Sequence, residues 1–215
     1  MIIFKNRQDA AIKLSEQLIK YSNLPETLIL ALPRGGVVLG AVLADRLNLP
    51  LEVAVAKKIN PPSSSEFAIG AIAEGGGIFI DPEYKSQFRK GYLEQEIRAK
   101  EEKVKEYLRE FRADQRELPL SGKTVILADD GIATGYTMLA AVESVRLKNP
   151  AKIVVAIPII PFDRVNLLRS IADELIFVDN PKDFMAIGQF YEYFPQVSSE
   201  EVKEILAKRA IKVKN

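Results

Sequence analysis

The sequence predicts an α/β protein with a mainly parallel, twisted sheet flanked by helices. Short continuous apolar runs, typical of strands buried on both faces, alternate along the chain with segments of helical periodicity. Parallel strands need a crossover connection, and helices usually supply it, so this alternation favours a parallel sheet. Ligands in such sheets bind at the carboxyl ends of the strands, and functional residues are therefore expected there.

The first 80 residues alternate between helical and strand-like patterns. Ala10, Ala11, Leu14 and Leu18 recur at helical spacing with charged residues between them, which predicts an amphipathic opening helix. Glycine, proline and serine mark the breaks between elements. In order, the expected elements are this helix, ending near 22–23, a strand over 28–32, a helix over 37–47, a buried strand over 51–56, a loop over 59–66 and a hairpin with strands over 67–73 and 78–80.

The stretch over 84–116 is highly charged and predicts a long helix. Leu93, Ile97, Val104 and Leu108 fall on one face of it, at spacings of four and seven. Such a helix either forms a dimer interface or lies on the surface of its own domain, and the pattern leaves both interpretations open. The alternating charges on the other face are typical of a solvated surface and imply no partner.

The last third of the chain returns to alternating strands and helices. The expected elements are a strand over 124–128, a helix over 137–147, a strand over 153–157, a helix over 164–171, a strand over 175–178, an aromatic segment over 184–194 and a closing helix over 199–209. Ser198 or Ser199 is the expected N-cap of the closing helix, with Glu200 and Glu201 in its first turn.

Composition excludes several kinds of catalytic site. The 215 residues include no His and no Cys, so a Ser-His-Asp triad, a thiolate nucleophile and a Cys/His zinc site are all excluded. A bound metal would need oxygen ligands, which favours magnesium, calcium or manganese. The net charge of +1 gives no reason to expect DNA, RNA or a membrane as partner. Without cysteine, a signal peptide pattern or a long apolar run, we expect a cytoplasmic protein.

The most informative stretch is Val125–Thr137, in which a buried strand ends in two aspartates. Asp129 and Asp130 are followed by a loop rich in Gly and Thr that opens a helix. Backbone N–H groups of such a loop and of the first helical turn form a phosphate-binding site. Carboxylates suit sugar hydroxyls or a magnesium ion better than phosphate, because like charges repel. The stretch therefore predicts a site for a ribose and its 5′-phosphate. An Asp-Asp-Gly turn alone would predict little.

This whole stretch resembles the PRPP-binding motif of the type I phosphoribosyltransferases. The resemblance implies that Asp129 and Asp130 hold the ribose hydroxyls as catalytic residues and contribute to magnesium binding, with the metal held mainly through PRPP. It also implies that the loop binds the 5′-phosphate; its residues are Gly131, Ile132, Ala133, Thr134, Gly135, Tyr136 and Thr137. The sequence most resembles an uncharacterised bacterial and archaeal branch of the family, in which Leu-Pro-Arg-Gly-Gly also occurs.

A second loop, Leu32–Val37, also follows a strand and opens a helix. It resembles the family's pyrophosphate loop, which often contains a non-proline cis peptide bond. The resemblance implies that Gly35 and Gly36 offer backbone N–H groups to the pyrophosphate and that Arg34 is a catalytic residue. A guanidinium binds diphosphate oxygens in a bidentate manner. Alone, Arg-Gly-Gly would be an ordinary tight turn.

Lys57 and Lys58, expected at the end of the second strand, precede the Pro/Ser loop that corresponds to the family's mobile catalytic loop. The resemblance implies that the lysines bind pyrophosphate, with Lys58 a catalytic residue, and that the loop closes over PRPP and excludes water. The alternative for both lysines is solvated surface charge.

The segment over 181–197 resembles the hood of the purine-salvage branch. There an aromatic residue stacks on the base, and Phe184 matches it; Ile132 is the other expected base contact. The alternative is that the aromatic residues form a small satellite core. Two positions depart from the purine branch: Ala133 replaces an acidic residue proposed as a base, and Lys182 replaces a magnesium-binding Asp, with Asp183 one position later.

The resemblance implies one phosphoribosyltransferase domain over residues 1–215. Its core covers about 24–80 and 121–180, the helical insertion 84–116, and the hood 181–197, followed by the helix over 199–209. The implied activity is a magnesium-dependent transfer of ribose 5-phosphate from PRPP to a nitrogenous base or amine, in nucleotide metabolism or salvage. Family precedent implies a homodimer.

Two alternatives of other classes stay open. One is a non-catalytic protein that senses PRPP or a nucleotide, and the other is a structural α/β protein whose loops bind nothing.

Overall fold

The computed structural model describes residues 2–62, 64, 67–112 and 117–212. Its main sheet has five strands in the order β2-β1-β6-β7-β8, and every neighbouring pair is parallel. The strands are β1 (Thr27–Ala31), β2 (Leu51–Val53), β6 (Thr124–Ala128), β7 (Lys152–Ile159) and β8 (Glu174–Asp179). The prediction of a mainly parallel sheet flanked by helices is confirmed.

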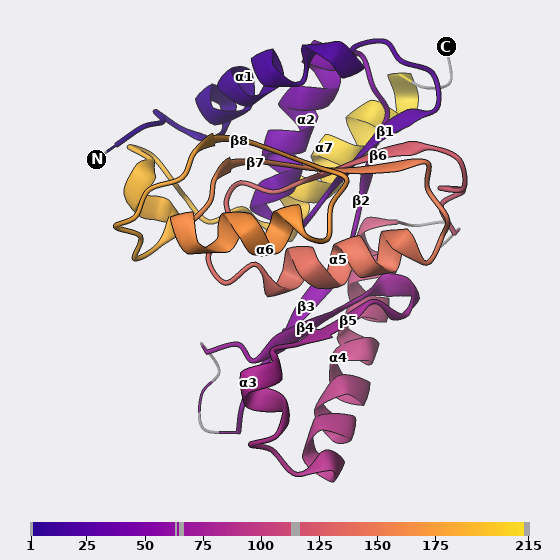
Figure 1. The fold of residues 1–215 in the computed structure, drawn as a ribbon. Helices are drawn as coiled ribbons and strands as arrows, with labels where there is room; N and C mark the ends of the chain where they lie inside the picture. Colours follow the sequence, from indigo (N-terminus) through magenta and orange to yellow (C-terminus); the bar gives the residue numbers. More distant parts are fainter. Residues whose placement is uncertain (1, 63, 65–66, 113–116, 213–215) are drawn as a thin grey trace.

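Helices cover both faces of this sheet (Figure 1). On one face lie α1 (Arg7–Gln17) and α2 (Gly35–Leu47), with α7 (Ser199–Lys212) beside α2. On the other lie α5 (Tyr136–Arg146) and α6 (Val165–Arg169). Strand β6 contributes side chains to the hydrophobic core on each face of the sheet. Ile126 packs on the α1/α2 side, and Val125 and Leu127 pack on the α5 side. This double burial explains why the strand is apolar at successive positions.

A second, antiparallel sheet projects from the main one. Because it takes up part of the segment, the prediction of a single strand over 51–56 is wrong. The order of this sheet is β3-β4-β5, formed by Ala56–Ile59, Gly70–Ala73 and Ile78–Ile80. The expected strand divides after Val53, because residues 54–55 carry the chain from one sheet to the other. The Ala54 N–H still donates to Ala31 O of β1 at 3.0 Å, whereas Val55 O accepts from Glu74 N, also at 3.0 Å. Both sheets bury this stretch, so the apolar run conceals the break. The predicted hairpin of β4 and β5 is confirmed.

The inserted helix packs on its own chain. After α3 (Pro82–Lys85), α4 (Lys90–Phe111) lies along the small sheet, as Figure 1 shows. Leu93, Val104 and Phe111 are buried there in a core shared with β3, β4 and α7. The structure therefore favours the second interpretation of the charged stretch, a helix lying on its own domain. Residues 113–116 of the predicted insertion lie outside the described residues.

The segment over 181–197 returns to the N-terminus. It contains a short 3-10 helix, Ile187–Phe190, and Tyr191 forms a parallel β-bridge with Phe4. Phe190 and Tyr191 are buried beside Phe4, so these aromatic residues belong to the core of the α1/α2 side. In α7, Ser198 Oγ accepts a hydrogen bond from Glu201 N at 3.1 Å and is the N-cap side chain. Among the described residues, no helix is both long enough and apolar enough to span a membrane.

Candidate functional site

The two predicted phosphate loops lie at the ends of neighbouring parallel strands. Ala31 and Ala128, the last residues of β1 and β6, are paired in register, and Leu32 N donates to Ala128 O at 2.9 Å. The peptide bond between Pro33 and Arg34 is cis, which the sequence alone left open. The Arg34-Gly35-Gly36 loop and the Asp129-Asp130 pair are therefore at one edge of the sheet, where α/β proteins bind ligands.

Gly35 and Gly36 allow the two loops to approach each other closely. A Cβ atom at Gly36 would lie 2.8 Å from Asp129 Oδ1, and one at Gly35 would lie 1.9 Å from Asp130 Oδ2. Both distances are too short for real atoms, so only glycine fits at these positions. The N–H groups of Gly35 and Gly36 donate to no acceptor within the described ranges, which leaves them for an anion.

Asp130 is held in place by Arg7, a residue that no sequence motif singles out. Arg7 Nε lies 2.6 Å from Asp130 Oδ2, and both side chains are about nine-tenths buried, at 9% and 11% exposed. The Arg7 guanidinium also lies 3.8 Å from the Phe194 ring centroid and donates to Pro195 O at 2.7 Å. The Tyr191 hydroxyl donates to Asp130 O at 2.6 Å. One carboxylate oxygen of Asp130 is thus committed to the fold.

Asp129 makes no ion pair with a cation of the described residues. It is half-buried, and its Oδ1 accepts a hydrogen bond from Asp130 N at 2.8 Å. Burial, followed by the charge of Asp130, raises the pKa of Asp129 well above its ordinary value. Burial also raises the pKa of Asp130, but Arg7 opposes that effect. When the pair takes up a proton, Asp129 is therefore the residue that carries it.

The Asp129 pKa leads to a first prediction, on stability. A carboxyl with a higher pKa in the folded state costs stability as the pH rises through the window between its unfolded and folded values. Asp129→Asn removes that cost and keeps the amide oxygen for Asp130 N. With a chelator present at pH 8, we expect the variant to be more stable by roughly 1–2 kcal/mol, or roughly 2–8 °C in Tm. The gain should shrink as the pH falls towards 4. An equal or lower Tm at pH 8, measured by calorimetry, would contradict it.

The loop after Asp130 presents several backbone N–H groups that are not hydrogen-bonded to other described residues. The N–H groups of residues 133–137 donate to no acceptor in the part of the chain that the structure describes. Ala133 is exposed, and Thr134 and Thr137 are half-exposed with hydroxyls that bond to no other described residue. Gly135 has a φ of 82°, which turns the chain into α5. This is the geometry expected of a phosphate site at a helix N-terminus.

Other members of this loop face inward. Ile132, expected to contact the base, is buried in the core and donates its N–H to Ile159 O at 3.0 Å. The Tyr136 hydroxyl donates to Asp81 Oδ2 at 2.5 Å, and its ring stacks on Phe79. A Cβ atom at Gly131 would lie 2.6 Å from Ile187 Cγ2 of the hood. These side chains support the loop from behind, while its backbone faces the site.

Arg34 and the two lysines occupy different surroundings. The Arg34 side chain is exposed and has no hydrogen-bond or ion-pair partner among the described residues. Lys57 and Lys58 lie within β3, not at the end of the second strand, so their side chains point to opposite faces of the small sheet. Lys57 is half-buried, with Nζ 3.0 Å from the Tyr107 ring centroid, and lies within range of the charge of Arg34. Lys58 is exposed.

The remaining predicted residues lie on the loop before the hairpin and in the hood. Ser63, Ser65 and Glu66 of the expected catalytic loop lie outside the described residues. Phe184 is half-buried, with its ring centroid 5.2 Å from that of Phe190, and Lys182 Nζ lies 5.4 Å from the Phe162 ring centroid. Asp183 O accepts a hydrogen bond from Gln189 Nε2 at 3.1 Å, but its carboxylate bonds to no described residue of the site.

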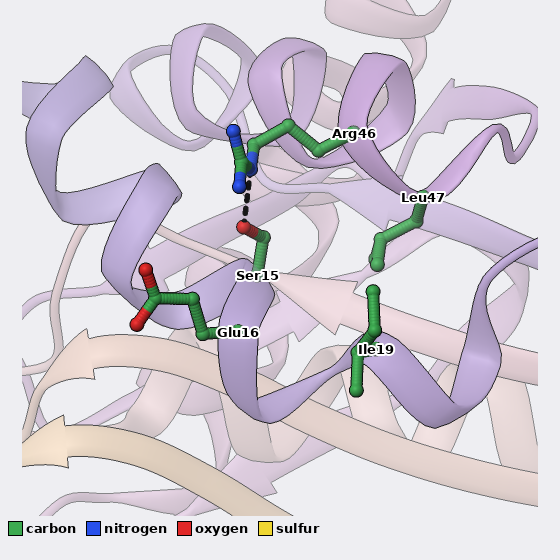
Figure 2. Close-up of a pocket in the computed structure, with 5 residues that line it drawn as sticks. All are labelled: Ser15, Glu16, Ile19, Arg46 and Leu47. Atoms are coloured by element: carbon green, nitrogen blue, oxygen red, sulfur yellow. Dashed lines mark hydrogen bonds between the residues drawn. The ribbon is translucent and has the colours of Figure 1, made fainter.

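Two cavities lie away from this edge. Figure 2 shows the first, about 240 Å³, between the ends of α1 and α2, where Arg46 Nε donates to Ser15 Oγ at 2.6 Å. Arg46 is nearly the full length of α2 from Gly35, roughly 16 Å at 1.5 Å per residue. The second, about 400 Å³, lies between α4 and the turn before β5; Glu74, Lys105, Arg112 and Lys148 are among its lining residues.

One feature of the sequence indicates that Arg7 is a candidate for burial. Residues 7, 10, 11 and 14 share one face of the opening helix, so Arg7 is a charged residue on an apolar stripe. A buried cation needs a buried partner, but this pattern does not identify which carboxylate supplies it. Tyr107 directly precedes Leu108 of the apolar face of the insertion, and nothing in the sequence indicates its contact with Lys57.

Fold and site together define a parallel α/β protein that carries two glycine-containing loops and two aspartates at the carboxyl edge of its main sheet. The chain belongs to the phosphoribosyl transferase domain family, whose model matches residues 3–193. This is a family of glycosyltransferase-type enzymes. A protein of Mycobacterium tuberculosis (strain CDC 1551), provisionally named a phosphoribosyl transferase, is 35% identical over 217 residues. That match covers 96% of this chain but 47% of the relative, so the chain spans about half the length of the curated relatives it matches.

Two solved structures that cover nearly the whole chain share this fold. A protein of Thermus thermophilus has a TM-score of 0.79 and 34% sequence identity, with 97% of this chain and 99% of that chain covered. A protein of Neisseria gonorrhoeae, solved with ppGpp bound, has a TM-score of 0.50 and 11% identity, with 97% of each chain covered. The second likeness shows a shared fold alone.

Proposed function

We propose that this protein transfers ribose 5-phosphate from PRPP to a nitrogenous base or amine and releases pyrophosphate. The observation that carries the proposal is the pairing of two anion-binding loops at the adjacent ends of β1 and β6, with two carboxylates between them. A ligand with phosphate at one end, diphosphate at the other and a ribose in the middle matches this order of groups. Family membership supports the same assignment.

Each group would act at a different part of PRPP. The backbone N–H groups of the Gly131–Thr137 loop and the start of α5 would hold the 5′-phosphate. Asp129 would accept hydrogen bonds from the ribose hydroxyls, together with the carboxylate oxygen of Asp130 that Arg7 does not occupy. Arg34, Lys57 and the N–H groups of Gly35 and Gly36 would stabilise the charge that develops on the departing diphosphate. The ribose ring becomes positive as the bond breaks, and the carboxylates favour that charge.

The oxygen ligands at this site, the carboxylates of Asp129 and Asp130, fit magnesium as the cofactor. When bound with PRPP, it would neutralise diphosphate charge. The half-buried Asp129 carboxylate forms no ion pair with any described cation, which suits a ligand that brings positive charge into the site. In the described ranges, no three acidic residues gather into a metal site. We therefore propose that the metal enters with PRPP and that Asp129 is its main protein contact.

We propose a role in nucleotide metabolism or salvage, with a nitrogenous base or amine as the acceptor. Ala133 offers no carboxylate to take a proton from a purine nitrogen, which argues against hypoxanthine and guanine. Phe184 in the hood is the aromatic side chain that we propose for stacking on the acceptor. We also propose a cytoplasmic homodimer with no nucleic-acid or membrane partner, as the composition and family precedent suggest.

Titration calorimetry with PRPP tests the proposal. We expect the wild-type protein to bind PRPP more tightly with magnesium than without. Changing both Asp129 and Asp130 to Asn should weaken binding at least roughly tenfold, since each charge-assisted hydrogen bond contributes roughly 1.5–3 kcal/mol. Glu26→Gln, at a carboxylate that precedes β1 and has a 70% exposed side chain, is the matched control and should bind normally. Wild-type binding no tighter than that of the double variant would refute the proposal.

The second candidate is a non-catalytic sensor of PRPP or a nucleotide. Ala133 favours it, because an enzyme lacking an acidic residue there needs another way to remove the acceptor's proton. A screen of bases and amines for PRPP-dependent pyrophosphate release separates the two functions. Turnover with any acceptor supports the transferase, whereas binding of PRPP without release across the screen supports the sensor.

A further inference from the structure

The inserted helix α4 reaches the pyrophosphate side of the proposed site through one contact. Tyr107, four residues before the last residue of the helix, presents its ring to Lys57, whose Nζ lies 3.0 Å from the ring centroid. Alternation along β3 places Lys57 on the same face as Ile59, which is buried in the core that α4 covers. The Lys57 side chain is therefore half-buried between the small sheet and α4.

Burial and a neighbouring cation disfavour the positive charge of Lys57, whereas two residues of α4 favour it. Burial lowers the pKa of Lys57, and the nearby Arg34 cation lowers it further. Tyr107, as a side-chain hydrogen-bond partner, and, more weakly, Glu110 raise that pKa, and both belong to α4. The face of the Tyr107 ring, whose centroid lies 3.0 Å from Nζ, also attracts the cation, so Tyr107 compensates a half-buried ammonium for its lost hydration. A lysine placed beside Arg34 without that ring would turn towards solvent or lose its proton.

The position of Tyr107 is itself fixed. Its ring meets Phe111 edge to face, with centroids 5.3 Å apart, and Phe111 is buried against the small sheet and α7. One turn from Tyr107, Glu110 Oε1 lies 3.9 Å from Lys203 Nζ of α7. The first turn of α7 is also within range of Arg34, since Arg34 and Glu200 interact electrostatically. Lys57, α4 and α7 are thus connected by side-chain contacts, and Arg34 lies within electrostatic range of Lys57 and Glu200.

We propose that Tyr107 is a positioning residue of the pyrophosphate site, whose ring holds the Lys57 ammonium beside Arg34 for contact with the diphosphate. The inference rests on the proposed function. It gives the insertion a role beyond covering the small sheet: α4 supplies one wall of the site. Tyr107 itself contacts no substrate atom and acts through Lys57.

The test measures binding of inorganic pyrophosphate with magnesium by titration calorimetry. Tyr107→Leu should weaken binding roughly 3- to 30-fold, the range expected for a partly desolvated cation–π contact. Tyr107→Phe keeps the ring and should restore most of the affinity. Leu93→Ala is the matched control: it truncates a buried side chain of α4 in the same core, fourteen residues before Tyr107, and should cost stability but leave binding within about twofold.

A double-mutant cycle separates positioning from a structural effect. In a Lys57→Met background, Tyr107→Leu should have no further effect on pyrophosphate affinity, because the contact that it removes is already absent. An effect that persists in that background, or a Tyr107→Leu protein that binds like the wild type, would overturn the inference. Fluorinated phenylalanine at position 107 keeps the ring's shape while withdrawing electron density from its face. It should also weaken binding, and it serves where the leucine variant does not fold.

Failure of the inference about Tyr107 can be distinguished from failure of the proposed function. Loss of the proposed function means that the wild-type protein binds neither PRPP nor pyrophosphate. Failure of the inference means that the wild type binds both while the Tyr107 variants behave like Leu93→Ala.

Discussion

Replacing Arg7 by Met is expected to destabilise the protein by roughly 3–5 kcal/mol, the usual cost of removing one partner of a buried ion pair. The variant leaves the Asp130 carboxylate buried without the cation 2.6 Å away, beside a second carboxylate. It also removes the guanidinium that packs on Phe194 and donates to Pro195 O. For a chain of this size the loss corresponds to roughly 6–20 °C in Tm, measurable by calorimetry at pH 7.

The pH dependence of this loss identifies its cause. Arg7 lowers the pKa of Asp130 against the effect of burial, so removing Arg7 makes that carboxyl easier to protonate. A protonated Asp130 no longer needs a cation, and the difference from the wild type should therefore narrow as the pH falls. Arg98→Met, at an exposed arginine of α4, is the control and should change stability by less than about 0.5 kcal/mol. A similar loss in both variants, or a loss that is constant with pH, would contradict the explanation.

The strands and the two loops could be predicted because each depends on local sequence. A run such as Val125–Ala128 is apolar at every position because helices cover both faces of its sheet, and that burial pattern is visible without a structure. The glycines and aspartates that follow are placed by the strand they terminate. Order along the chain was therefore enough to locate the edge where Arg34, Asp129 and Asp130 meet.

Contacts between distant segments could not be predicted in the same way. Arg7 and Asp130 are 123 residues apart, and their pairing depends on how α1 packs across the sheet. The division of the expected 51–56 strand escaped detection because both sheets bury Val53 to Val55, so no polar residue marks the crossing. The separation of Lys57 from Lys58 follows from that division, since only residues inside a strand alternate between faces.

Gly35→Ala is the other variant with a large expected effect, because it places an atom where two buried charges already meet. The added Cβ would lie 1.9 Å from Asp130 Oδ2 and 2.9 Å from Arg7 Nε. Neither side chain can move into solvent, so the start of α2 shifts or the ion pair breaks. We expect a loss of roughly 2–4 kcal/mol in unfolding free energy. PRPP affinity should fall more than roughly tenfold, since the N–H groups of Gly35 and Gly36 move with the helix.

Gly91→Ala tells this steric effect from a general effect of glycine replacement. Gly91 lies in α4, and a Cβ atom there would meet nothing within 4 Å. Alanine favours a helix, so this control should be stabilised by up to about 1 kcal/mol and should bind PRPP normally. In an Asp130→Ala background the atom nearest to the new Cβ is gone, and Gly35→Ala should then cost much less than in the wild type. An undiminished cost there would mean that the backbone of the Pro33–Gly36 loop, and not its contact with Asp130, requires glycine.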